Sequence, residues 1–328
     1  MKQITELFLS FFSQYDTYII AGHKEPDGDC IGSCLALDSW LKRKGKKTIL
    51  LSSGPFKRPE IKEYEPLFVS SISDTSNIVK TGLIVVDCSG IDRIGDAIVG
   101  LENLPIAIID HHATNDTNFN FTFIDATAPS STILVQSLIE KSGDTPNLRE
   151  AEFLLFGLCT DTGFFRHLDS NSAETFAATA RLIHAGANPK QVFAQISGGK
   201  SWGSRILISR ILSRMTRHYE GRLVISWETI EDTQEFGLEG RDSDILYQLI
   251  QSISGVEAIV IVRQESPERC TVGFRSKNKI DVSQIAAYFG GGGHKQASGL
   301  SIEGTISNLI PDFIQAFEAQ FLLLDNQK

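Results

Sequence analysis

The chain has 328 residues, of which 41% are hydrophobic and 22% charged, as expected for a soluble globular protein with room for two domains. Its formal net charge of -9 argues against a broad basic surface for long nucleic acid, although a few arginines could still hold a small anion. The five cysteines include no C-x-x-C pair, so neither a disulfide framework nor a structural zinc site is indicated, and a reducing cytoplasm is the expected compartment.

The first predicted element is a short amphipathic helix over residues 3–15. Its apolar part, Leu7 to Phe12, has no basic segment before it and is too short for a signal peptide or a membrane span. A strand over 18–21, a helix that ends near the basic run 42–47, and a strand over 48–51 follow. We therefore expect a soluble protein that begins as an open α/β sheet.

The loop after the first strand carries several ligand-type side chains. It reads Gly22-His23-Lys24-Glu25-Pro26-Asp27-Gly28-Asp29, so His23, Asp27 and Asp29 lie where an open α/β sheet binds its ligands. One imidazole and two carboxylates can converge on a divalent cation. Taken alone, the same residues would also suit a polar surface turn shaped by Pro26 and Gly28, so other stretches must decide.

Two further runs, 83–86 and 106–109, are almost wholly apolar, as in parallel strands covered on both faces. Each ends in an aspartate, Asp87 or Asp110, and Asp110 begins the triplet Asp110-His111-His112. Aspartate is a poor strand residue, so its recurrence at strand ends predicts acids gathered along one edge of the sheet.

The rest of the chain divides into two parts. Predicted helices near 130–141 and 150–160 bring Asp161 to a turn, and helices near 172–185 and 189–196 complete a first domain placed at 1–196. The small polar segment 197–202 is the predicted linker. For the second domain, 203–328, the pattern predicts strands at 223–227, 258–263 and 270–275 and helices near 203–217, 242–252 and 282–289, with one more helix at the end. The predicted fold is α/β: a mainly parallel sheet flanked by helices, then a smaller mixed α/β domain.

Four separate stretches now supply acids and imidazoles to the same predicted sheet edge. Two histidines and four aspartates suit two adjacent divalent ions, with Asp87 as the natural bridging ligand, whereas a metal-free cluster of four carboxylates would repel itself. Mixed imidazole and carboxylate donors favour Mn²⁺ over Mg²⁺, with Co²⁺ or Zn²⁺ as substitutes. The candidate donors are His23, Asp27 and Asp29, then Asp87, the triplet Asp110-His111-His112, and Asp161.

With these motifs the sequence resembles the DHH phosphoesterase superfamily, named for the triplet that is here Asp110-His111-His112. The run from Gly290 to Gly299 resembles the Gly-Gly-Gly-His signature of the associated DHHA1 domain. The similarity covers roughly residues 15–300 and is greatest to the stand-alone oligoribonuclease and 3′-phosphoadenosine 5′-phosphate (pAp) phosphatase proteins of the NrnA type. It implies an active site in a cleft between the two domains and two divalent ions, Mn²⁺ first and Mg²⁺ or Co²⁺ as alternatives.

The resemblance also implies roles for single residues. His23, Asp27 and Asp87 would hold one ion, and the other would be held by Asp29, Asp87, His111 and Asp161. His112 would face the substrate phosphate as hydrogen-bond donor or general acid, and Asp110 would orient the neighbouring histidines. A core histidine satisfied by backbone groups is the structural alternative for His112.

In the second domain the resemblance implies nucleotide contacts from Arg275, Ser276, Gly292, Gly293, His294 and Gly299. Arg275 ends a predicted strand, where its guanidinium could grip a phosphate. A glycine run alone is more often a flexible linker. Arg166, close to Asp161, could reach the substrate or form a surface ion pair. The cysteines near the ligands, Cys30, Cys88 and Cys159, suit buried packing better than a redox role.

The implied activity is hydrolysis of short RNA oligonucleotides and dinucleotides to mononucleotides and of pAp to AMP, by attack of a metal-activated hydroxide on phosphorus. Cyclic di-AMP hydrolysis is the main alternative, because it would use the same metals. An inorganic pyrophosphatase, an exonuclease on long strands and a non-catalytic nucleotide sensor fit less well. We expect no long nucleic acid and no membrane as partners, and a homodimer is left open.

Overall fold

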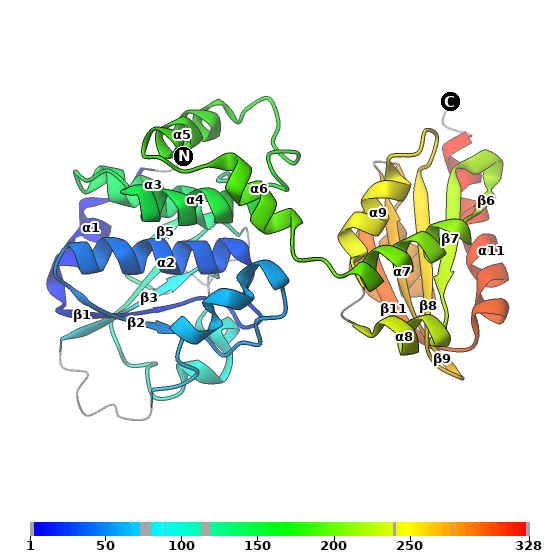
Figure 1. The fold of residues 1–328 in the computed structure, drawn as a ribbon, viewed down its shortest axis with the longest axis horizontal. Helices are drawn as coiled ribbons and strands as arrows, with labels where there is room; N and C mark the ends of the chain where they lie inside the picture. The colour runs from blue at the N-terminus through cyan, green and yellow to red at the C-terminus, as the bar shows by residue number, and fades with distance from the viewer. Residues whose placement is uncertain are drawn as a thin grey trace. The chain divides into compact units, whose positions relative to one another are not determined.

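The computed structural model describes residues 3–72, 80–88, 90–112, 119–238, 241–277 and 279–325 (Figure 1). The chain divides into two compact units, Met1–Gly199 and Lys200–Lys328, called here the first and the second unit. Among the described residues, no helix has both the length and the apolar character needed to cross a membrane.

The first unit is built on a five-stranded parallel sheet, which confirms the predicted fold class. Each strand pairs in parallel with its neighbour, in the order β2-β1-β3-β4-β5. The strands are β1 (Thr17–Ala21), β2 (Lys47–Leu51), β3 (Thr81–Val86), β4 (Ile106–Asp110) and β5 (Phe121–Ile124). Alternate residues of β1, β3 and β4 enter two separate cores, one on each face of the sheet. The apolar runs predicted as parallel strands are therefore covered on both sides.

Helices cover this sheet, and α2, α3 and α4 lie side by side in one layer (Figure 1). Each of these three helices begins at a capping side chain, namely Asp27, Ser130 or Asn147. The helices of the unit are α1 (Glu6–Gln14), α2 (Gly28–Arg43), α3 (Ser131–Lys141), α4 (Leu148–Asp161), α5 (Ala173–His184) and α6 (Pro189–Ser197), with 3₁₀ segments η1 (Pro59–Leu67) and η2 (Ile91–Ile98).

Close helix packing brings the ends of these elements together. A Cβ atom on Gly32 of α2 would lie 2.6 Å from the Phe153 carbonyl oxygen, and one on Gly157 of α4 would lie 3.1 Å from the Asp29 Cα. Only glycine permits such an approach at these two positions. Helix α4 can therefore run close beside α2, so that Asp161, its last residue, reaches the edge where β1, β3 and β4 also end.

The second unit contains a six-stranded mixed sheet in the order β10-β11-β9-β8-β7-β6, in which only β7 and β8 run parallel. Its strands are β6 (Thr216–His218), β7 (Leu223–Glu228), β8 (Ala258–Ser266), β9 (Arg269–Ser276), β10 (Gly292–His294) and β11 (Ala297–Glu303). Its helices are α7 (Trp202–Ser213), α8 (Ile230–Phe236), α9 (Ser243–Gln251), α10 (Val282–Tyr288) and α11 (Ile306–Asp325), with the short 3₁₀ turn η3 (Tyr219–Gly221).

One predicted boundary in this unit is wrong. The helix predicted to reach residue 217 ends at Ser213, because Thr216–His218 pairs with β7 as an edge strand. The structure adds that Gly292–His294, at the end of the glycine run, forms β10, which pairs antiparallel with β11. In both places cross-strand pairing, which a local sequence pattern does not reveal, decides the conformation.

Candidate metal centre

The structure brings all six predicted metal ligands together at the carboxyl edge of the first sheet. His111 is at the centre: its Nε2 lies 3.8 Å from Asp29 Oδ2, 3.5 Å from Asp87 Oδ1 and 3.4 Å from Asp161 Oδ2. These acids come from the start of α2, the end of β3 and the end of α4. Residues more than 130 positions apart in the chain thus share one site.

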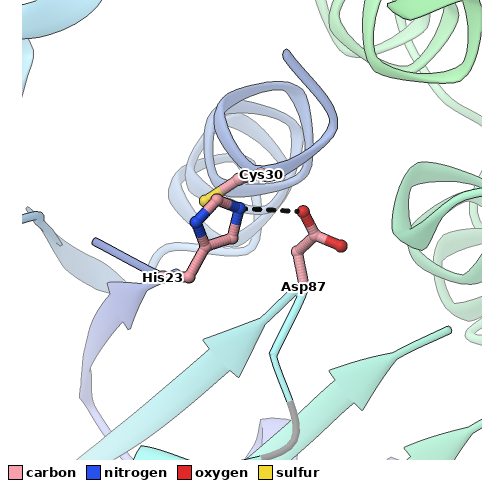
Figure 2. A group of neighbouring side chains, drawn as sticks. All are labelled: His23, Cys30 and Asp87. Atoms are coloured by element: carbon pink, nitrogen blue, oxygen red, sulfur yellow. Dashed lines mark ion pairs between the residues drawn. The ribbon is translucent and has the colours of Figure 1, made fainter. Parts of the chain in front are cut away.

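His23 occupies the other side of Asp87. Its Nε2 lies 3.5 Å from Asp87 Oδ2 and 3.9 Å from Asp27 Oδ1, so the two oxygens of Asp87 face different imidazoles. Figure 2 shows the His23 ring and the Asp87 carboxylate pointing toward each other, with the Cys30 side chain beside the ring. Asp87 therefore lies between the two imidazoles, an arrangement compatible with the bridging role predicted for it.

Cys30 is the neighbour that sequence reasoning assigned to packing. Its sulfur lies with the ligand atoms of His23 and Asp87 in a group whose members are all within 4.8 Å of one another. A hydrogen bond to Cys34 and burial raise the pKa of the Cys30 thiol well above its ordinary value. The thiol therefore keeps its proton in the metal-free chain, as expected of a buried cysteine.

Both predicted imidazole ligands are held in the orientation that metal-binding histidines commonly have. His23 Nδ1 lies 2.8 Å from the Lys24 carbonyl oxygen, and His111 Nδ1 lies 3.3 Å from that of Ala128. A ring N–H donated to a backbone carbonyl at Nδ1 leaves the lone pair at Nε2, which in both cases is the atom that faces the carboxylates. The two rings thus present Nε2 to the same acidic cluster.

The charges of the cluster are unbalanced. Among the described residues, no lysine or arginine forms an ion pair with Asp27, Asp29, Asp87 or Asp161. Burial and the neighbouring charges of Asp87 and Asp161 raise the pKa of Asp29 well above its ordinary value, and burial raises that of Asp161 to about 6. Both shifts favour the neutral, protonated form of these two acids relative to an ordinary aspartate.

The pKa values of the imidazoles are raised as well, but for a different reason. Burial disfavours the charged form of both rings, but the adjacent carboxylates outweigh burial and raise the pKa of His23 to about 12 and that of His111 to about 10. The two protonated rings in turn hold the pKa of the buried Asp87 below its ordinary value. The carboxylates thus favour protonated, positively charged imidazoles. The nitrogen and oxygen donors of the cluster also suit divalent cations that accept both atom types.

Helix α3 begins directly at this cluster. The backbone N–H groups of Ser131 and Thr132 donate to the Asp29 carboxylate at 2.5 and 3.0 Å, and the Thr132 hydroxyl donates to it at 2.8 Å. The Ser131 hydroxyl donates to Asp87 Oδ1 at 3.0 Å. These contacts were not predicted; the run Ser130-Ser131-Thr132 was identified only as a helix start, and nothing in it specifies which acids it meets.

Two other predicted ligands owe their orientation to the backbone. Asp27 Oδ1 caps α2 by accepting from the N–H groups of Asp29 and Cys30 at 3.1 and 3.0 Å. Asp87 has a positive φ of 58° immediately after β3, a left-handed conformation that aspartate tolerates better than most residues. This turn directs its carboxylate across the ends of the strands.

Asp110 and His112 form a separate pair beside the cluster. Asp110 is fully buried, and its Oδ1 accepts from the backbone N–H groups of His111 and His112 at 2.8 and 3.2 Å. The same oxygen lies 2.8 Å from His112 Nδ1 and raises the pKa of that ring. Since Nδ1 is engaged, Nε2 is the atom of His112 available to a substrate. The orienting role predicted for Asp110 agrees with this geometry and stays a prediction.

The residues predicted to bind substrate in the second unit fall into two groups. Arg275, Gly299, Gly292 and His294 lie on neighbouring strands, because β9 pairs with β11 and β11 with β10. Gly293, with φ 139°, is the middle residue of β10 and has no room for a Cβ beside Ser298. Ser276 is buried, and its hydroxyl donates to the Ile280 carbonyl oxygen at 2.7 Å, so its proton is already used in a hydrogen bond within the unit.

Arg166 lies on the first unit, in the turn that follows α4. It is exposed, and its Nε donates to the Gly163 carbonyl oxygen at 2.8 Å. Among the described residues Arg166 forms no ion pair, and its contact with substrate stays a prediction.

Comparison with known proteins adds family information to this geometry. Residues 17–158 match the model of the DHH family, N-terminal domain, and residues 221–322 match that of the DHHA1 domain. The chain is 30% identical over 305 residues to the bifunctional oligoribonuclease and PAP phosphatase NrnA of Thermus thermophilus, covering 91% of this chain and 86% of that protein. It is 28% identical to the Bacillus subtilis protein of the same name, covering 91% and 93%.

Among solved structures, the fold is similar to that of an exopolyphosphatase-related protein from Bacteroides fragilis. The TM-score is 0.81 at 25% sequence identity, and the match covers 99% of both chains. The match therefore includes both the parallel sheet of the first unit and the mixed sheet of the second.

Proposed function

Since the chain belongs to the DHH family and carries a DHHA1 domain, we propose that it is a two-metal phosphoesterase that hydrolyses short oligoribonucleotides and dinucleotides to mononucleotides and converts pAp to AMP. One observation carries the proposal: six nitrogen and oxygen side chains, from four separate stretches, meet at one sheet edge without a lysine or arginine counter-charge among the described residues. The names of the two curated relatives support the choice of substrates.

The proposed ligand sets share Asp87. His23, Asp27 and Asp87 would hold one ion, and Asp29, Asp87, His111 and Asp161 the other, with Mn²⁺ as the expected metal and Mg²⁺ or Co²⁺ as alternatives. Two divalent ions bound in this way supply a nucleophile from water at neutral pH and offset the charge that builds up on a phosphoryl group. Asp87 is suited to the shared position because its oxygens face opposite imidazoles.

The protein's own groups would then bind the substrate and move the proton. His112, kept protonated by Asp110, can donate the proton on Nε2 to a phosphate oxygen or to the departing oxygen. Asp110, which lies 2.8 Å from Nδ1 of this ring, would keep it oriented with Nε2 free for the substrate. On the second unit, the Arg275 guanidinium is suited to a phosphate of the bound nucleotide. Substrates of a few nucleotides fit a chain with net charge -9 better than long strands do.

A side-by-side assay tests the proposal. The full chain with Mn²⁺ is incubated with pAp, pApA, a five-nucleotide RNA, cyclic di-AMP and pyrophosphate, and kcat/KM is ranked. We expect turnover of pAp, pApA and the short RNA, with cyclic di-AMP and pyrophosphate slower. Cyclic di-AMP or pyrophosphate in first place would overturn the substrate assignment, and no turnover of any substrate would overturn the proposed function.

A further inference from the structure

One face of the second sheet carries a row of glycines. Gly273 of β9 lies opposite Gly299 of β11, and Gly299 lies opposite Gly292 of β10. Residues directly opposite each other in antiparallel strands share a face, so the three Cα atoms form a line across the sheet without side chains. A Cβ atom on Gly292 would meet nothing within 4 Å, so the row is open at that end.

Tyr247 closes the other end of the row. It lies on α9, is 5% exposed, and has its hydroxyl so close to Gly273 that a Cβ there would lie only 2.2 Å from that oxygen. Glycine at 273 is therefore required to admit the tyrosine. The usable part of the row runs over Gly299 and Gly292, with Tyr247 as its wall on the side of β9.

Arg275 is on the same face, two residues beyond Gly273, and differs from the other arginines nearby. Arg241 pairs with Glu228 and Glu265 at 2.8 and 3.0 Å, and Arg263 pairs with Glu228 at 3.2 Å. Among the described residues, Arg275 forms no ion pair. Its guanidinium donates to the Phe274 carbonyl oxygen at 2.9 Å and lies 4.6 Å from the centre of the Tyr247 ring. It is thus a positive charge held by an aromatic face, without a protein anion to neutralise it.

We infer that Tyr247 is a positioning residue that holds the Arg275 guanidinium beside the glycine row, where it grips a phosphate of the nucleotide lying over Gly299 and Gly292. This rests on the proposed function, because the anion in question is the nucleotide substrate. Stacking on a buried ring restricts a flexible side chain before the ligand arrives, which lowers the entropic cost of binding. Tyr247 therefore acts on substrate affinity through Arg275 and does not contact the reacting phosphorus.

A double-mutant cycle on the full chain with Mn²⁺ and pAp tests this inference. Tyr247→Leu, which removes the aromatic face, should raise KM several-fold to about tenfold and change kcat less than twofold. Tyr247→Phe keeps the ring and should restore most of the lost affinity. In the Arg275→Ala background, Tyr247→Leu should add nothing to KM, because the group that it positions is gone. Equal effects of Tyr247→Leu with and without Arg275 would overturn the inference.

The second unit supplies a matched control. Arg210 lies over the Phe236 ring at 4.8 Å, a similar arginine–aromatic pair built from α7 and α8 rather than beside the glycine row. Phe236→Leu should leave the KM for pAp within twofold of wild type. A rise in KM as large as that of Tyr247→Leu would show that loss of any such pair disturbs the unit, which would contradict the positioning role.

Fluorinated phenylalanines at position 247 keep the inference testable if Tyr247→Leu does not fold. Each added fluorine weakens the negative face of the ring while nearly preserving its shape, so KM should rise stepwise with fluorine number. A flat series would overturn the inference. If Arg275→Ala leaves KM unchanged, Arg275 does not grip the phosphate and the inference is rejected. A normal Arg275 effect with a flat series rejects only the role of Tyr247. If wild type turns over none of the substrates, the proposed function fails instead.

Discussion

Each unit contains a buried cluster with carboxylates, and these two clusters differ in their counter-charges. In the first unit, Asp29 and Asp87 are buried, and among the described residues they form ion pairs only with imidazoles. In the second, the equally buried Glu228 is paired with Arg241 and Arg263 at 2.8 and 3.2 Å. A buried charge needs a counter-charge, so the first arrangement awaits cations from outside, whereas the second is complete within the protein.

The difference separates two kinds of buried charge that sequence alone cannot tell apart. A balanced cluster such as Glu228 with its arginines maintains one conformation and needs no ligand. In an unbalanced cluster the pKa values of the titratable groups rise, as those of Asp29, Asp161 and His111 do. A bound cation would displace the protons that these groups hold. Substitutions in the two clusters should therefore have opposite consequences, with activity lost in one and stability in the other.

The largest effect is expected from Asp87→Ala. Because Asp87 faces both His23 and His111, its removal takes a ligand from both proposed metal positions. We expect kcat/KM for pAp with Mn²⁺ to fall by at least ~10³-fold, as when metal-organising groups are lost. Asp16→Ala is the control, since Asp16 is exposed and, within the described part of the chain, its carboxylate pairs only with Lys80, at 3.7 Å. Activity near that of wild type in the Asp87 variant would refute the metal centre.

Glu228→Ala should lower the stability of the second unit, whereas Asp87→Ala lowers activity. It leaves the Arg241 and Arg263 guanidiniums, 18% and 13% exposed, without their shared carboxylate, and breaking a buried pair in this way costs about 3–5 kcal/mol of unfolding free energy. Denaturant unfolding of the second unit measures the loss. Glu235→Ala, which breaks only an exposed pair with Arg210, should cost less than about 1 kcal/mol. Equal losses for the two variants would show that Glu228 is not part of a structural network.

Ser131→Ala should give a smaller effect, confined to the first unit. The variant removes the hydroxyl that donates to Asp87 at 3.0 Å but leaves the backbone N–H groups that hold Asp29. Loss of such a support typically lowers metal affinity about tenfold or more, so calorimetric Mn²⁺ titration should report a weaker Kd. Ser142→Ala, at the far end of α3, is the matched control. An unchanged Kd for Ser131→Ala would show that this hydroxyl does not support the ligand.

The smallest expected effect is a shift in pH dependence. Asp110 raises the pKa of His112, so the ring stays protonated to higher pH than a free histidine, and kcat/KM should fall as pH rises through that pKa. Asp110→Asn removes the negative charge and lowers the pKa of His112, so the alkaline limb of the kcat/KM profile should move to lower pH. A limb that stays in place would mean that His112 does not donate the proton.

Much of the first unit could be predicted from the sequence. Apolar runs that end in Asp87 and Asp110 required parallel buried strands, and parallel strands necessarily bring their carboxyl ends to one edge. The loop with His23, Asp27 and Asp29 follows a strand of the same sheet. The topology therefore predicted that these acids and imidazoles gather at one edge, and the resemblance to the DHH superfamily implied which six of them are ligands.

What could not be predicted depends on contacts between distant segments. Whether the hydroxyl of Ser131 meets Asp87, or the ring of Tyr247 meets Arg275, is set by helix packing and not by any local pattern. The same holds for the edge strand Thr216–His218 and for Gly292–His294, whose short stretches look like a helix end and a loop until a partner strand pairs with them.

The number of Mn²⁺ ions bound per chain tests the central claim most directly. Equilibrium titration of the full chain, followed by electron paramagnetic resonance, should give two ions per chain whose signals are coupled through the shared Asp87 carboxylate. Asp87→Ala should abolish the coupling and weaken both sites, whereas Asp16→Ala should leave both unchanged. Fewer than two bound ions in wild type, or two ions whose binding and coupling survive Asp87→Ala, would contradict the account.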